Sequence, residues 1–93
     1  VAVGDHVSLG PLAVVGHDSV IGEHSILAPA ALVSGFVRVG RACYLGAACA
    51  VRQRVVIGDE ALIGIGAVVL RNVPPQGTVV GNPARPLAKP QLV

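Results

Sequence analysis

Hydrophobic positions recur along this chain with a period of six residues, from Val3 to Pro74. Each unit opens with an aliphatic residue, usually continues with glycine, and has a small or β-branched residue at its fifth position. The twelve first positions are Val3, Leu9, Val15, Ile21, Leu27, Val33, Val39, Leu45, Val51, Ile57, Ile63 and Val69. An unbroken short period of this kind is the sequence signature of a solenoid.

The period also predicts the shape of the solenoid. A strand alternates its faces every two residues, so a six-residue repeat of one large aliphatic indicates a short strand followed by a turn. We expect the first and fifth positions to point into a core, and the glycine to let the backbone turn and pack closely. Three units would close a triangular coil, and successive coils would pair as parallel strands about 4.8 Å apart. The predicted coils are 3–20, 21–38, 39–56 and 57–74.

The repeat is predicted to end at a pair of prolines. Pro74 and Pro75 cannot donate hydrogen bonds to a strand ladder, and a short extended piece over 78–80 follows them. The predicted domains are therefore a β-helix over 1–74 and a C-terminal cap or tail over 75–93.

Composition agrees with a narrow all-β prism. The 93 residues make one small domain with one Tyr, one Phe and no Trp, which suits a core too narrow for rings. A short prism with two open ends buries little surface, so we expect an oligomer. Glycine and charged residues interrupt every apolar run before it reaches about 18 residues, so the sequence does not predict a membrane span.

The basic residues all lie at or after Arg38. This part of the chain could hold the phosphates of a nucleotide cofactor, or could simply be a solvated face. With a net charge of +2 and almost no aromatic residues to stack on bases, the sequence does not favour nucleic-acid binding. Cys43 and Cys49 fall at inward fifth positions, are interpreted as small buried hydrophobes, and fit a reduced, cytoplasmic protein.

Residues eighteen apart become neighbours when coils stack, so columns of side chains follow from the sequence. His6 is predicted to stack on His24 at a surface turn. His17 is predicted to lie beside Gly35, where the imidazole could take a proton from an acceptor and the Gly35 N–H could stabilise a developing oxyanion. Asp18 could hold the imidazole in the required tautomer. The same pattern also fits a solvent-facing histidine beside a turn glycine.

Three motifs make nearly the whole chain similar to the hexapeptide-repeat acyltransferases, and within them to the sialic-acid and bacillosamine-type sugar O- and N-acetyltransferases. They are HDSVIG at 17–22, GIGAVV at 64–69 and VVGNPAR at 79–85. The resemblance implies a left-handed parallel β-helix that transfers an acetyl group directly from acetyl-CoA to an amine or hydroxyl of a sugar-type acceptor. It implies His17 as general base, Asp18 as its partner and Gly35 in contact with the acetyl group.

The resemblance also places the cofactor in a groove between the subunits of a homotrimer. Ala47 and Ile65 match groove positions and share one column with Pro29. Ile26 stands where relatives often carry a second histidine that contacts the cofactor. Members of this family usually have an N-terminal α/β domain that binds the sugar nucleotide, and no counterpart is expected in this sequence.

Two other functions remain open at this point. The chain could be a catalytically inactive trimerisation module. It could also resemble the γ-class carbonic anhydrases, which would need His6, His17 and His24 to converge on a metal. Their spacing places His6 and His24 on one edge and His17 on another, so no metal is expected.

Overall fold

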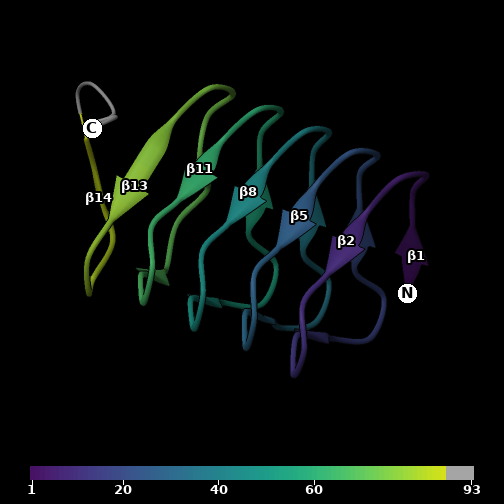
Figure 1. Cartoon of the computed structure of the whole chain (residues 1–93). Helices are drawn as coiled ribbons and strands as arrows, with labels where there is room; N and C mark the ends of the chain where they lie inside the picture. The colour runs from purple at the N-terminus through teal and green to yellow at the C-terminus, as the bar shows by residue number, and fades with distance from the viewer. Residues whose placement is uncertain (88–93) are drawn as a thin grey trace.

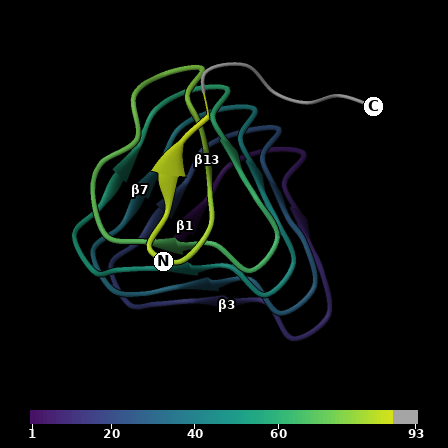
Figure 2. The ribbon, with the colours of Figure 1, turned by 90° about the vertical axis from the view of Figure 1, so that its left-hand side faces the viewer.

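The computed structural model, which describes residues 1–87, is a parallel β-solenoid built from three sheets (Figure 1). Sheet A contains β1 (Ala2–Val3), β4 (Val20–Ile21), β7 (Arg38–Val39) and β10 (Val56–Ile57). Sheet B contains β2 (Ser8–Leu9), β5 (Ile26–Leu27), β8 (Tyr44–Leu45), β11 (Leu62–Ile63), β13 (Thr78–Val80) and β14 (Arg85–Pro86). Sheet C contains β3 (Val14–Val15), β6 (Leu32–Val33), β9 (Ala50–Val51) and β12 (Val68–Val69). Viewed along the solenoid axis, the three sheets form a triangle (Figure 2).

The strand register confirms the predicted coil length. Val3 pairs with Ile21, and Ile21 pairs with Val39, so each step along sheet A advances the chain by eighteen residues. The same offset joins neighbouring strands up to β11 in sheet B and throughout sheet C. The architecture is the predicted all-β solenoid of about four turns, as expected of a left-handed parallel β-helix.

Both predicted inward positions are buried from the second coil onward. First positions such as Ile21, Leu45 and Ile63 are at most 1% exposed. First positions in the first coil, such as Val3, are more exposed because no coil stacks on their outer side. Fifth positions with polar side chains are satisfied by the next coil: the Ser25 hydroxyl donates to the Gly40 carbonyl at 2.8 Å and accepts from the Cys43 amide at 3.1 Å.

The turns correct one prediction, because the glycine at the second position does not make the turn. The left-handed conformation falls at the fourth position of the first eleven units, for example at Asp18 (φ 60°) and Phe36 (φ 59°). The second-position glycines instead allow close stacking. A Cβ atom on Gly16 would lie 2.5 Å from the Ser34 carbonyl carbon and 2.7 Å from the Gly35 nitrogen, closer than side chains can pack.

The twelfth unit, which begins at Val69, is shorter than the period predicts. The period places Val73 at an inward fifth position, but its backbone bridges Ile57, which is a first position, so the coil loses two residues there. Val73 is buried all the same. The extended piece predicted over 78–80 is β13, which pairs in parallel with β11, and β14 then pairs antiparallel with β13. The division at residue 74 stays a prediction, and residues 88–93 of the expected tail lie outside the described residues.

Candidate functional site

The three corners of the prism differ in chemical character. The AB corner, between sheets A and B, carries the acidic residues Asp5, Glu23, Asp59 and Glu60, together with Arg41, His6 and His24. The BC corner, comprising residues 10–13, 28–31, 46–49 and 64–67, has no charged residue. The CA corner, comprising residues 16–19, 34–37, 52–55 and 70–72, carries His17, Asp18, Arg52, Arg54 and Arg71. The fold therefore gathers charged residues that are scattered along the sequence at the AB and CA corners and leaves the BC corner uncharged.

His17 lies at the CA corner between β3 and β4, and both of its ring nitrogens have defined neighbours. The Nδ1 atom is 3.2 Å from Oδ2 of Asp18. The Nε2 atom faces Gly35, where an added Cβ atom would lie only 3.0 Å away. Both His17 and Asp18 are largely exposed, with side-chain exposures of 76% and 66%. The structure thus brings His17, Asp18 and Gly35 together.

The backbone of Gly35 leaves a donor free beside the imidazole. Its carbonyl accepts from the Arg54 amide at 3.0 Å, but within residues 1–87 its N–H has no hydrogen-bond partner. Other third-position N–H groups, such as those of Ala47 and Ile65, are also without a partner in this range, whereas the Arg41 N–H is bonded to the Asp59 carboxylate at 2.9 Å. Gln53 follows Gly35 in the column, so no carboxylate lies next to Gly35 as Asp59 lies next to Arg41.

Two residues that the sequence reasoning did not single out complete this corner. The Phe36 ring meets the His17 ring edge-on, with centroids 5.1 Å apart and an interplanar angle of 89°. The Arg54 guanidinium carbon lies 4.6 Å from the centroid of the same Phe36 ring. Phe36 and Arg54 follow Asp18 at steps of eighteen residues, so the column rule that pairs His17 with Gly35 would also have found them.

The other candidate cofactor residues lie elsewhere on the prism. Ala47 is half-buried and Ile65 is 79% exposed at the BC corner, and they share a column with Pro29, as predicted. Ile26 is on the outer face of β5 in sheet B and is 43% exposed. Within one chain, sheet C lies between the BC corner and the CA corner, and sheet B, which carries Ile26, lies opposite the CA corner. The structure therefore does not bring all the candidates together.

The remaining histidines pair as predicted. The His6 and His24 rings are stacked, with centroids 5.0 Å apart and an interplanar angle of 8°. His17 is at a different corner, so the three histidines do not converge within one chain. In the part of the chain that the structure describes, no group of three or more His, Cys, Asp or Glu side chains could hold a metal ion.

Neither cysteine is placed to act as a nucleophile. Cys43 and Cys49 are unpaired thiols in the core, and both are 1% exposed. Burial raises the pKa of the Cys49 thiol to about 11, and burial also raises the pKa of Cys43. Both thiols stay protonated near neutral pH, which is consistent with their interpretation as small buried hydrophobes.

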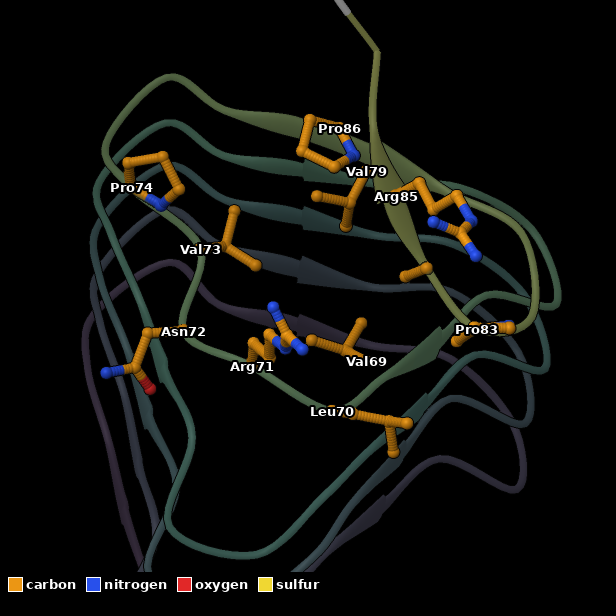
Figure 3. A pocket seen from close by; sticks show the side chains of 11 residues that line it. Val69, Leu70, Arg71, Asn72, Val73, Pro74, Val79, Pro83, Arg85 and Pro86 are labelled. Atoms are coloured by element: carbon orange, nitrogen blue, oxygen red, sulfur yellow. The ribbon is translucent and has the colours of Figure 1, made fainter.

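A cavity of about 380 Å³ opens at the end of the solenoid that carries β14 (Figure 3). Val69, Val73 and Val79 line its apolar side, and Arg71 and Arg85 also border it. This cavity lies three coils from His17 along the CA corner. It holds neither an acid–base pair nor a nucleophile, so we place the candidate reaction centre at His17. Within residues 1–87, the structure contains no helix long and apolar enough to cross a membrane.

The chain folds as a β-helix of hexapeptide repeats and is similar to acyltransferases that share this repeat. The family model described as "Bacterial transferase hexapeptide (six repeats)" matches residues 1–35. No curated protein matches the sequence significantly.

Solved structures of acetyltransferases are similar over most of the chain. WeeI from Acinetobacter baumannii AYE is 30% identical with a TM-score of 0.79, over 92% of this chain and 54% of its own. Serine acetyltransferase from Vibrio cholerae is 27% identical with a TM-score of 0.90, over 98% of this chain and 39% of its own. GDP-perosamine N-acetyl transferase from Caulobacter crescentus, solved with CoA and GDP-perosamine, is 28% identical with a TM-score of 0.64, over 95% of this chain and 53% of its own. The chain therefore spans about half or less of the length of these relatives.

Proposed function

We propose that this chain carries the transfer site of an acetyltransferase that uses acetyl-CoA, with His17 as general base and Asp18 as its partner. The observation that carries the proposal is the close packing of Nε2 of His17 against Gly35, whose N–H has no hydrogen-bond partner within residues 1–87. A base and an oxyanion donor side by side are the two groups that acyl transfer requires.

Each group has one task in a direct transfer. Nε2 of His17 accepts the proton of the acceptor amine or hydroxyl as that atom bonds to the acetyl carbon. The Gly35 N–H donates to the thioester oxygen as negative charge develops there. The protonated imidazole then returns the proton to the departing thiolate of CoA. Asp18, 3.2 Å from Nδ1, orients the imidazole and stabilises its charged form.

The uncharged BC corner suits the pantetheine arm of the donor. Ala47 and Ile65 offer small or apolar contacts there, and Ile26 extends the same apolar surface on sheet B. In a homotrimer, the BC corner of one subunit would face the CA corner of the next, and the groove between them would hold acetyl-CoA. The outer face of sheet C supports such contact, since its residues are all apolar: Val14, Leu32, Ala50 and Val68.

The acceptor is an amine or hydroxyl, of sugar type by analogy with the perosamine enzyme. Serine acetyltransferases are also similar in structure, so the fold itself does not select a sugar. The two unpaired thiols fit a cytoplasmic location.

A second candidate function is an inactive trimerisation module. The continuous apolar face of sheet C favours it, because this face serves assembly whether or not the chain is catalytic. Replacing His17 with Ala separates the two functions, since the module would keep its assembly and lose nothing else.

The direct test is calorimetric titration of CoA into the purified chain, with wild type beside Gly35→Val. The valine would collide with the His17 ring and close the acetyl position. Binding to wild type that is lost in the variant supports the donor site. A folded wild-type chain that does not bind CoA would contradict the proposal and favour the module.

A further inference from the structure

We infer that Arg54, held against Phe36 next to His17, is the anchor for an anionic group, a phosphate or carboxylate, carried by a substrate of the His17 site. The inference rests on the proposed function for the identity of that substrate, but the anion site itself follows from the geometry of the CA corner.

The first observation is the continuity of the column. The His17 ring touches Phe36 edge-on, and Phe36 in turn carries the Arg54 guanidinium at 4.6 Å. Arg54 therefore lies two coils from the proposed base, about 10 Å at the spacing of parallel strands. A ligand that reaches Nε2 of His17 and runs along the corner meets Arg54.

The second observation is that Arg54 is restrained but has no ionic partner. An arginine stacked on an aromatic face loses part of its conformational freedom and keeps its N–H donors at the edge of the guanidinium group. Within residues 1–87, Arg41 is the arginine that forms ion pairs, with Glu23 and Glu60 at 3.5 Å each. No ion pair or side-chain hydrogen bond in that range involves Arg54.

The third observation is the sorting of charge. The carboxylate at the CA corner is Asp18, which is engaged with His17, while Arg52 and Arg71 flank Arg54 on the same corner. The acidic residues Asp5, Glu23, Asp59 and Glu60 lie at the AB corner instead. A planar, pre-positioned guanidinium in a positive field is suited to bidentate contact with phosphate or carboxylate.

The probe that tests the anion site without relying on catalysis is pyrophosphate, titrated into ¹⁵N-labelled protein and followed by NMR. We expect shifts centred on Arg54, Phe36 and the amide of Gly35. Arg54→Gln should weaken binding roughly tenfold, the loss expected for one charge-assisted hydrogen-bonded contact. Gln is tolerated at this turn position, because Gln76 has the same left-handed backbone with φ 62°.

Arg41→Gln is the matched control, since it removes an exposed arginine from the AB corner and should leave pyrophosphate binding unchanged. Equal weakening by both variants, or binding that Arg54→Gln does not change, would overturn the inference. An absence of pyrophosphate binding to the folded protein would overturn it as well.

A second titration identifies the source of the anion. If Arg54→Gln weakens CoA binding by the same factor as pyrophosphate binding, the anion belongs to the donor. If CoA binding is unchanged, the anion belongs to the acceptor, and glucosamine 1-phosphate should bind the wild type more tightly than glucosamine does. Pyrophosphate binding through Arg54 without any CoA binding would leave the anion site in place and contradict the proposed transferase.

Discussion

A Cβ atom at Gly35 would lie 3.0 Å from Nε2 of His17, so the space that the imidazole uses exists because residue 35 has no side chain. Even a methyl group must therefore displace the ring. We expect Gly35→Ala to lower kcat/KM for acetyl transfer by about tenfold or more, because small misplacements of a catalytic group are costly. The assay is release of free CoA thiol from acetyl-CoA.

Gly66→Ala controls for the effect of a new methyl group on folding. Gly66 has open space around its Cα, and Ala30, Ala42 and Ala48 show that alanine is accepted at this left-handed turn position. Gly66→Ala should fold but melt somewhat below the wild type, because Gly66 has φ 67°, where alanine is strained. If a folded Gly35→Ala protein transfers acetyl groups at the wild-type rate, His17 and Gly35 do not have the proposed roles in the reaction.

Replacing Asp18 with Asn should change the reaction and leave stability almost untouched. The His17–Asp18 contact is solvent-exposed, and exposed ion pairs contribute little to folding. The loss of the carboxylate should instead lower kcat several-fold, with little change in KM for acetyl-CoA. The reason is that the Asp18 carboxylate orients the base and not the donor. Glu60→Gln at the AB corner is the control, and a stability loss without a kcat effect would argue for a structural role.

Ser25 should contribute to stability through its two buried hydrogen bonds. In Ser25→Ala, the Gly40 carbonyl and the Cys43 amide both lose their partner inside the prism. We expect a loss of about 1–3 kcal/mol in the free energy of unfolding, measured with urea. Ser8→Ala is the matched control, because Ser8 is exposed and its replacement should cost far less. Equal effects of the two variants would contradict this account.

Cys49 should make the fold weaker at alkaline pH. Burial raises the pKa of this thiol from 9.0 to about 11 in the folded state, so between these values the unfolded chain binds fewer protons than the native one. Stability should fall as the pH rises from 9 to 11, by about 3 kcal/mol for this group. Alanine already occupies the same column at Ala31 and Ala67, so Cys49→Ala should fold and should reduce that dependence when urea unfolding is compared across the range. If the free energy of unfolding falls with pH as steeply in Cys49→Ala as in the wild type, Cys49 is not the cause of the pH dependence.

The sequence by itself determined the fold and the core of the candidate site. Each coil repeats the last, so a residue's neighbours are found eighteen positions away, and this rule placed His17 beside Gly35 and His6 on His24. The same rule placed the first and fifth positions inside the prism. Long-range contacts could be predicted from the sequence because, in a solenoid, neighbouring coils are separated by a fixed number of residues.

Only the tertiary structure decided which backbone and side-chain groups remain free. It assigned the left-handed turns to the fourth positions, shortened the coil at Val73, and left the Gly35 N–H without a partner. It also stacked Arg54 on Phe36 and sorted acidic and basic residues to different corners. These features depend on backbone torsions, rotamers and the closure of three sheets around one axis, none of which a six-residue period specifies.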